Sequence, residues 1–293
     1  MVLDRLFALV NKPEYILRPS QIVRRVLGKH GNEIVLPWNV RMNINPHETI
    51  GRSIKNTGFH DLTVTESITR LLEKGETGID AGANIGYFTL LMSRLVGDNG
   101  CVYAFEPHPM IFRKLKQHLN DNEIKNSIIE QRGLSSDVMQ AYLQMPDNFK
   151  ANEGVASVSF ETSNTATKIE LTTLNYYFEK MGIGMVGVMK IDVEGHELNL
   201  LKGASTLLQN GKIRDIIYED HSSQPSNVAS YLQSFGYTLM RIEKKLMKPI
   251  LYPFDKLLNT YSWDTPNYIA THDVKRVEQK FRGLGWYCLR QLK

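Results

Sequence analysis

The segment Gly78–Phe88, which reads GIDAGANIGYF, decides the fold. An apolar strand pattern precedes it and a run with helical spacing follows it, so its glycines lie where the chain must turn sharply. The fingerprint of a dinucleotide-binding loop has glycines at relative positions 1, 3 and 6. Here Gly82 is followed at the second and third of those positions by Asn84 and Tyr87. The segment therefore predicts a strand–loop–helix unit. Its loop is less well suited to bind a pyrophosphate group of a ligand.

Around this segment, from about residue 66 onward, strand and helix patterns alternate along the chain. Such alternation is typical of βαβ units and predicts an α/β fold with a mostly parallel sheet. Ligands of such sheets bind beyond the carboxyl ends of the strands. Residues 137–172 lack a helical period and are expected to be looser and β-rich. We expect strands at 77–80, 101–105, 127–131, 186–193, 213–218, 237–242 and 268–271, and helices at 87–96, 110–120, 174–181, 198–208 and 228–235.

Two carboxylates flank the glycine loop. Asp80 stands just before it, where its charge would repel phosphate but suits an ammonium group, and Glu106 follows 26 residues later at the end of the next strand. A carboxylate in that second position accepts hydrogen bonds from ribose hydroxyls. S-adenosylmethionine has an ammonium group and a ribose and lacks phosphate, so we predict it as the cofactor, with S-adenosylhomocysteine as product. The predicted cofactor-binding residues are Asp80, Gly82, Asn84, Gly86, Phe88, Glu106 and Pro107.

A second cluster of polar residues follows the two later strands of the predicted sheet. Asp192, Glu194 and His196 come after the apolar strand that begins at residue 186, and Glu219 and His221 end the next strand. Carboxylates and imidazoles that meet in one cleft suit proton removal from a hydroxyl, and His196 is best tuned to accept the proton near neutral pH. Helix capping is the alternative role for the acids. A divalent metal would fit such ligands, but nothing in the spacing requires one, and none is predicted.

The chain resembles the FkbM family of methyltransferases from about residue 34 to 245. The resemblance is carried by Gly78–Leu90, Phe105–Pro107 and Lys190–Glu197, with Leu201–Ala204 after them. It implies a class I methyltransferase (Rossmann-like) fold, with a seven-stranded sheet whose last strand is antiparallel. It also implies O-methylation of a hydroxyl on a sugar, polysaccharide, glycolipid or other natural product. One departure is Asn175, where the family often has an aspartate.

We expect three parts along the chain. Residues 1–45 form an extension of helical and extended pieces, and residues 46–272 form the methyltransferase domain. Residues 244–264, rich in lysine and aromatic side chains, are a candidate lid, and residues 273–293 form a basic helix and tail. Residues 1–33 and 246–293 lie outside the region that resembles the family. We expect them to contribute to the choice of acceptor.

Charge is unevenly distributed over the 293 residues, whose formal net charge is +4. Residues 1–60 hold nine basic and four acidic side chains, and residues 273–293 hold six and two, so the middle of the chain is acidic. Solvated basic ends explain this pattern, and an acidic partner such as a membrane surface, an anionic glycan or a nucleic acid would also fit it.

The two cysteines, Cys101 and Cys288, form no CxxC pair, which argues against a zinc site or a disulfide framework. We therefore expect a reducing, cytoplasmic compartment. The sequence shows neither a signal-peptide pattern nor an apolar run long enough to span a bilayer. Peripheral contact with a membrane and a homodimer built on the N-terminal helices remain compatible with it.

The main alternative is an RNA 2′-O-methyltransferase, which would share the donor site and explain the basic ends. The sequence has no RRM, KH or zinc-knuckle signature, so a nucleic-acid acceptor is not expected. A second alternative is a regulatory protein that keeps the donor site without turnover. The converging carboxylates and imidazoles favour an enzyme over that reading. Asn84 and Tyr87 disfavour a nicotinamide oxidoreductase.

Overall fold

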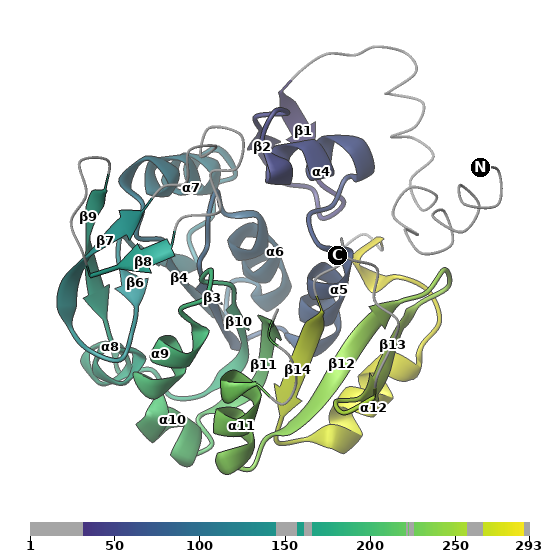
Figure 1. Cartoon of the computed structure of the whole chain (residues 1–293). Helices are drawn as coiled ribbons and strands as arrows, with labels where there is room; N and C mark the ends of the chain where they lie inside the picture. Colours follow the sequence, from purple (N-terminus) through teal and green to yellow (C-terminus); the bar gives the residue numbers. More distant parts are fainter. Residues whose placement is uncertain are drawn as a thin grey trace.

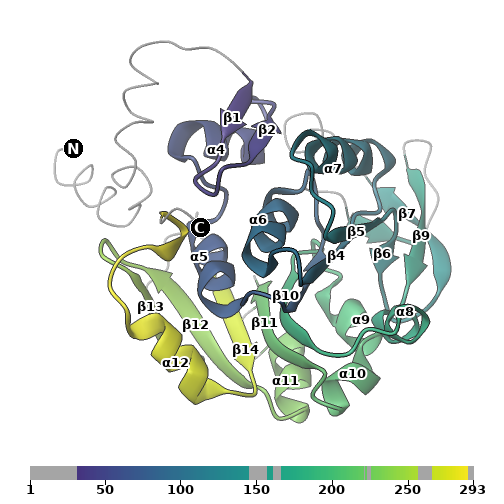
Figure 2. The same cartoon turned by 180° about the vertical axis from the view of Figure 1, so that it is seen from behind.

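A computed structural model shows a three-layer α/β fold, with one large sheet between two layers of helices (Figures 1 and 2). It describes residues 32–144, 157–160, 166–220, 222, 226–256 and 266–289. Across the large sheet the strands are β13 (Pro249–Pro253), β12 (Thr238–Lys244), β14 (Asn267–Thr271), β11 (Ile213–Glu219), β10 (Val186–Ile191), β3 (Thr77–Ala81), β4 (Cys101–Phe105) and β5 (Ser127–Glu130).

The pairing within this sheet confirms the predicted fold class. Strands β11, β10, β3, β4 and β5 are mutually parallel, and β14 enters antiparallel between β11 and β12. The sheet has eight strands rather than seven, because β13 pairs antiparallel with β12 inside the segment expected as a lid. A proline at each end confines β13 to the edge of the sheet, where a missing N–H donor is tolerated. Part of the candidate lid, residues 257–264, lies outside the described residues.

Every side chain of β10 is buried, because both faces of the sheet are covered. Val188 packs into the core on one face and Met189 into the core on the other. One layer holds α5 (Leu62–Leu71), α6 (Tyr87–Val96), α7 (Pro109–Asp121) and α12 (Val274–Arg282), and the other holds α8 (Leu174–Met181), α9 (Glu197–Lys202), α10 (Ser205–Gln209) and α11 (Asn227–Ser234).

The single helix expected at 198–208 is two helices, α9 and α10. Gly203 separates them, and a Cβ atom there would lie 1.9 Å from the carbonyl oxygen of Ser135. The close approach of these two backbones interrupts the helix. Residues 137–172, expected to be loose, contribute most of a second, four-stranded sheet. Its order is β6 (Gly133–Leu134), β9 (Thr167–Thr172), β7 (Met139–Gln144) and β8 (Ser157–Ser159).

The described part of the N-terminal extension joins the main core. A hairpin of β1 (Glu33–Val35) and β2 (Arg41–Asn43) precedes α4 (Thr49–Thr57), and these elements lie beside α5 and α6 (Figure 2). The buried ring of Trp38 meets Tyr87 of α6 edge-on, with ring centroids 5.2 Å apart. The predicted helices within residues 1–31 fall outside the described residues.

A buried ion pair on α5 holds the C-terminal segment. Arg70 Nε lies 2.6 Å from Glu66 Oε1, and neither side chain is exposed to solvent. The Glu66 carboxylate accepts hydrogen bonds at 2.8 and 2.9 Å from the first two N–H groups of the 3₁₀ helix η2 (Tyr287–Leu289). Arg70 donates to the carbonyl oxygen of Gly285 at 2.7 Å. The segment after α12 is therefore fixed to the core through its backbone.

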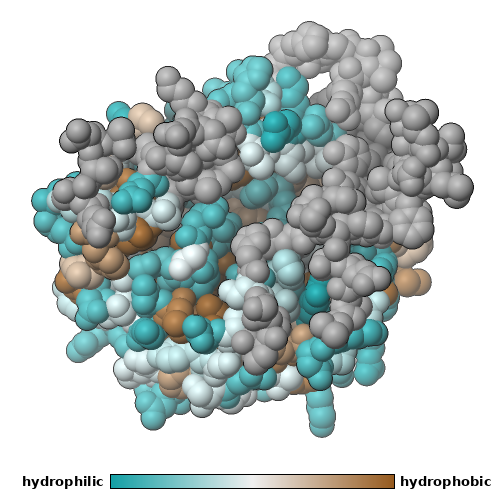
Figure 3. Space-filling view, viewed as in Figure 1, coloured by the Kyte–Doolittle hydropathy of each residue, from teal (hydrophilic) through white to brown (hydrophobic). Residues whose placement is uncertain are grey.

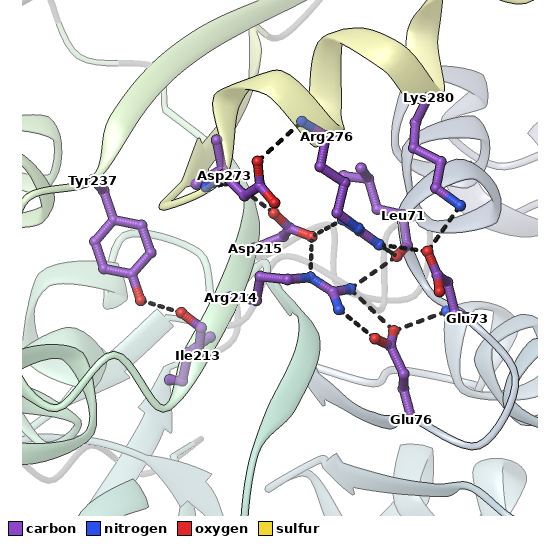
Figure 4. Close-up of polar contacts among 11 residues, drawn as sticks. Leu71, Glu73, Glu76, Ile213, Arg214, Asp215, Tyr237, Asp273, Arg276 and Lys280 are labelled. Carbon is purple, nitrogen blue, oxygen red and sulfur yellow. Dashed lines mark hydrogen bonds and ion pairs between the residues drawn. The ribbon is translucent and has the colours of Figure 1, made fainter.

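At the amino ends of the strands, charged side chains form a closed network (Figure 4). Arg214 of β11 pairs with Glu76 and Asp215, and Arg276 of α12 pairs with Asp215 at 2.8 Å and with Glu73 at 3.1 Å. This network ties α12 to the sheet.

The face of the molecule seen in Figure 3 is mostly hydrophilic, with small separate apolar patches. No helix of the described residues is both long and apolar enough to cross a bilayer.

Candidate active site

A cavity of about 410 Å³ opens at the carboxyl ends of β3, β4, β10 and β11. This is the edge at which α/β sheets bind their ligands. Gly82, Glu106, Asp192 and Glu219, which end these strands or directly follow them, all line it. Helix α4 contributes further lining residues, so the N-terminal segment helps to form the walls of the cavity.

Two glycines of the loop after β3 are required by packing against neighbouring segments. Gly82 has a φ of +76°, and a Cβ atom there would lie 1.9 Å from the carbonyl oxygen of Asp192. Gly86 has a φ of +94°, and its Cβ would lie 2.6 Å from a methyl carbon of Leu115 on α7. Only glycine allows the loop to pass this close to both neighbours.

Glu106 is held in the cavity wall by two backbone donors. Its Oε2 accepts from the N–H of Asn84 at 2.9 Å, and its Oε1 accepts from the N–H of His108 at 2.8 Å. Burial raises the pKa of this carboxyl to about 7 despite those hydrogen bonds. Pro107 lines the cavity beside it. The two donors thus fix a buried carboxyl at this strand end, and its contact with the ribose of S-adenosylmethionine stays a prediction.

Asp80 does not line the cavity. It is fully buried, accepts a hydrogen bond from Thr89 Oγ1 at 2.6 Å, and lies 3.3 Å from Lys190 Nζ. Burial raises its pKa. Its direct partner is therefore a lysine of the protein rather than the ammonium group of a cofactor. A role of Asp80 in the donor site, exerted through Lys190, remains a prediction.

Lys190 is the most informative residue that the sequence interpretation missed. Its ammonium lies 2.8 Å from the carbonyl oxygen of Gly82, 3.3 Å from Asp80 and 3.5 Å from Asp192. Burial opposes its charge, but Asp192 and Asp80 together raise its pKa. The available signal was a lysine inside an otherwise apolar buried strand, since a buried lysine requires partners. Lys190 therefore contacts both Gly82 of the glycine loop and Asp192 of the predicted acceptor site.

Asp192, Glu194 and His196 all line the cavity, as the sequence predicts for neighbours in one cleft. Glu194 has a φ of +52° and opens to solvent, yet the surrounding protein displaces enough water to raise its pKa to about 7, with a further rise from the charges of Asp192 and Glu197. The buried ring of His196 contacts Ser135 Oγ at 2.9 Å through Nε2 and Asn199 Nδ2 at 3.3 Å through Nδ1. Burial lowers its pKa.

Glu219 lines the far end of the cavity and shares a hydrogen bond with Asp61. Burial raises the pKa of Glu219 to about 9, and the charges of Asp61 and Asp192 add to this rise. Asp61 is held by Thr63, by the N–H of Val64 at 2.9 Å and by Asn267. The pair therefore holds a proton at neutral pH. His221, the other predicted residue of this strand end, lies outside the described residues.

The loop between α4 and α5 also brings His60 to the cavity. Its ring centroid lies 5.8 Å from that of Tyr87 and 5.9 Å from that of Phe88. Burial lowers its pKa, although Asp61 and Asp192 act in the opposite direction. His60 and Asp61 precede a helix in a stretch with no motif, so no sequence signal singled them out.

Within the residues that the structure describes, no group of three or more histidine, cysteine or carboxylate side chains is arranged to hold a metal ion. Five of the seven predicted cofactor-binding residues line the cavity: Gly82, Asn84, Phe88, Glu106 and Pro107. The other two, Asp80 and Gly86, do not.

The solved structures that match this chain share little sequence with it. The S-adenosylmethionine-dependent O-methyltransferase of Thermotoga maritima matches 79% of this chain and 72% of its own at 14% identity, with a TM-score of 0.45. Fibrillarin of Aeropyrum pernix, solved with bound S-adenosyl-L-methionine, matches 71% and 74% at 15% identity, with a TM-score of 0.41.

Sequence relatives are more informative. The hexuronic acid methyltransferase AglP of Haloferax volcanii is 33% identical over 180 residues, which are 59% of this chain and 70% of that protein. The 31-O-demethyl-FK506 methyltransferase FkbM of Streptomyces tacrolimicus is 24% identical over 198 residues, or 58% of this chain and 75% of that protein. The family model of the methyltransferase FkbM domain matches residues 80–239, more than half of the chain. The resemblance carried by the three motifs is thereby confirmed, and the chain belongs to the FkbM family of S-adenosylmethionine-dependent methyltransferases.

Proposed function

We propose that this enzyme transfers a methyl group from S-adenosylmethionine to a hydroxyl of a sugar, or of a natural product that carries similar hydroxyls. The observation that carries the proposal is one continuous cavity with Glu106 at one end and the Asp61–Glu219 pair at the other. The first end suits a ribose, and the second offers several hydrogen-bond acceptors to a polyhydroxylated molecule. The names of AglP and FkbM, which refer to a hexuronic acid and to a demethylated oxygen, support the same acceptor class.

When bound, S-adenosylmethionine supplies a methyl group on a positively charged sulfur. We assign the ribose contact to Glu106, and the shape of the donor end to Gly82, Asn84, Phe88 and Pro107. Lys190 fixes the carbonyl of Gly82 and the carboxylate of Asp192 relative to each other, and Asp80 forms an ion pair with the same ammonium group. Gly86 starts α6 and orients it.

At the acceptor end, Asp192, Glu194, His196 and Glu219 remain our predicted border. Glu219 is protonated below about pH 9, so it is suited to donate a hydrogen bond rather than to accept a proton. Asp192 and Glu194 are suited to accept hydrogen bonds from hydroxyls. Such an arrangement aligns one hydroxyl for attack and thereby lowers the entropic part of the barrier.

The charge of this end disfavours the alternative RNA 2′-O-methyltransferase. Carboxyl groups from the loop before α5, from β10 and from β11 all face the cavity, and phosphates would be repelled by those that carry charge. With this function we also propose a cytoplasmic location, peripheral contact with a membrane, a homodimer and the three-part division of the chain.

The proposal is tested by incubating the protein with methyl-labelled S-adenosylmethionine and separate fractions of glycans, glycolipids, small natural products and RNA. We expect alkali-stable label in a sugar-containing or natural-product fraction, because methyl ethers survive alkali and methyl esters do not. Label confined to RNA would transfer the function to the alternative. Alkali-labile label would place the methyl group on a carboxylate and contradict O-methylation of a hydroxyl.

A further inference from the structure

His60 occupies a position that links the donor loop to the acceptor end of the cavity. Its ring packs against Phe88, and Lys190 Nζ lies 5.1 Å from the centroid of that same phenyl ring. Lys190 in turn contacts the carbonyl oxygen of Gly82 in the glycine loop. A small side cavity is lined by His60 together with Asp61, Lys190, Asp192 and Glu219. The imidazole is thus surrounded by groups of both ends of the site.

Its ring nitrogens differ from those of His196, which lines the cavity together with His60 and His108. His196 uses Nε2 toward Ser135 and Nδ1 toward Asn199. No hydrogen bond to either ring nitrogen of His60 occurs among the described residues, whose contacts with this ring are aromatic. His60 therefore has a ring nitrogen available for a hydroxyl, whereas His196 is suited to hold the loop after β10 in place.

The carboxyl groups nearby are less suited to accept a proton. Glu219 already carries one at neutral pH, and Asp61 is occupied by Thr63, Val64 and Asn267. Asp192 is paired with Lys190. The remaining competitor is Glu194, which opens to solvent at the cavity mouth rather than packing against the aromatic rings of α6.

The loop that carries His60 is held in an unusual conformation. Asp61 has a φ of +41° and ψ of +91°, a combination that non-glycine residues rarely adopt, and its side chain caps α5. The cap and the hydrogen bond from Asn267 of β14 keep this backbone in place. Strain of this kind is found at sites where a side chain must be aimed in one direction.

We propose that His60 is the general base of the methyl transfer, an inference that rests on the proposed function. In the step, the acceptor hydroxyl gives its proton to a ring nitrogen of His60 while its oxygen bonds to the methyl carbon. The carbon–sulfur bond of the donor breaks and its electron pair stays on sulfur. The products are a methyl ether, S-adenosylhomocysteine and an imidazolium, which then releases its proton to water.

The charged groups around His60 fit this role. Asp61 on its own loop and Asp192 after β10 stabilise an imidazolium, whereas Lys190 of β10 opposes it. Other titratable groups that line the cavity are Glu219 of β11, Glu106, Glu194, Lys244, His108 and His196. Because burial dominates and lowers the pKa of His60, the ring is neutral near pH 7 and able to accept a proton.

The test compares His60→Asn with wild type. The acceptor is the fraction that wild type labels in the methyl-transfer experiment above. We expect kcat to fall about 100-fold or more, the range of general-base catalysis, while the Kd for S-adenosylmethionine measured by calorimetry stays within about twofold. Because the pKa of His60 is lowered, wild-type kcat should decline only at a pH below the ordinary histidine value of about 6.5, and this decline should disappear in the variant. In His60→Ala, added imidazole should restore part of the rate. His47→Asn, a change at an exposed histidine outside the cavity, is the matched control and should match wild type.

The outcomes separate the two proposals. If wild type methylates a hydroxyl and His60→Asn retains its kcat and its acid-side decline, His60 is not the base. If Glu194→Gln abolishes the decline instead, the base is Glu194 and the inference is overturned. A His60→Ala variant that keeps donor affinity but gains no rate from imidazole would also contradict it. Failure of wild type to methylate any hydroxyl fraction would overturn the proposed function, and the assignment of His60 with it.

Discussion

Ionisable side chains are buried at both the amino and the carboxyl ends of the strands in the main sheet. Their pKa shifts favour the charged forms at one end and the neutral forms at the other. At the amino ends, Arg214, Arg276 and Lys280 face Glu73, Glu76 and Asp215, so that cations and carboxylates are equal in number (Figure 4). Hydrogen bonds from Lys280 lower the pKa of Glu73. Burial works against the charge of Arg214, but hydrogen bonds to Glu76 and Asp215 raise its pKa. Both shifts favour the charged forms.

At the carboxyl ends, carboxyl groups outnumber the cations that line the cavity, and burial is the largest cause of each shift. It raises the pKa of Glu106 and of Glu194 to about 7 and that of Glu219 to about 9. These shifts favour the neutral forms. The difference teaches that buried charge by itself does not mark a functional site. Buried carboxyls that are left short of cations, in a cavity, do mark one.

The largest effect should come from breaking the amino-end network. Asp215→Ala removes a fully buried carboxylate that partners Arg214 and Arg276, and leaves both guanidinium groups without it. We expect a loss of about 3 kcal/mol in the free energy of unfolding, measured with urea, and an unchanged Kd for S-adenosylmethionine. Glu170→Ala breaks the exposed Arg132–Glu170 pair and should cost under about 1 kcal/mol. Equal losses in the two variants would show that burial of the pair does not matter.

A smaller effect, on binding rather than stability, is expected at the carboxyl ends. Glu106→Ala removes the carboxyl acceptor proposed to bind the ribose, which we expect to weaken S-adenosylmethionine binding by about 1.5–3 kcal/mol, or roughly 10- to 100-fold. The melting temperature without ligand should fall only modestly, because the N–H groups of Asn84 and His108 lose their acceptor while the burial cost of the carboxyl is removed. Calorimetry that shows unchanged affinity would contradict the ribose assignment.

A third effect should appear as a dependence on pH. Because the pKa of Glu219 rises from 4.5 to about 9 on folding, the folded protein binds this proton more tightly than the unfolded chain between those values. Stability contributed by this proton is therefore lost as pH rises through that window. Glu219→Gln retains a donor toward Asp61 and has no such proton. Relative to wild type, its melting temperature should rise by about a few °C between pH 5 and pH 8.5.

A constant difference between the two proteins across that pH range would mean that Glu219 does not retain its proton on folding. Glu123→Gln changes an exposed residue that does not line the cavity. It provides the control, and its melting temperature should follow that of wild type at every pH.

Much of the fold was predictable because its signals are local. The glycine loop, the strand that carries Lys190 and the alternation of strands with helices each extend over a few residues, and the structure confirms the fold class from them. The boundary errors arise where distant segments meet. Gly203 interrupts a helical pattern because the backbone of Ser135 passes beside it, and no local pattern in residues 198–208 reveals that neighbour.

The candidate site was predictable to the extent that it lies at strand ends. Glu106, Asp192 and Glu219 are brought to one cavity because parallel strands end at the same edge. Asp80 was placed at that edge by the same rule, but its side chain turns into the core, toward Lys190 and Thr89. His60 reaches the cavity only because the segment before α5 packs over α6, a long-range contact without a sequence signature.

The position of β14 has a consequence for how the chain is made. β14 (Asn267–Thr271) lies between β11 and β12, although both of these strands precede it in the sequence. As the protein emerges from a ribosome, β12 and β13 are complete while the place beside β11 is still empty. The nascent sheet therefore keeps an open edge on β11 until residue 271 has left the exit tunnel. Closure of the core is consequently a late event, and the order of synthesis differs from the order of the strands in space.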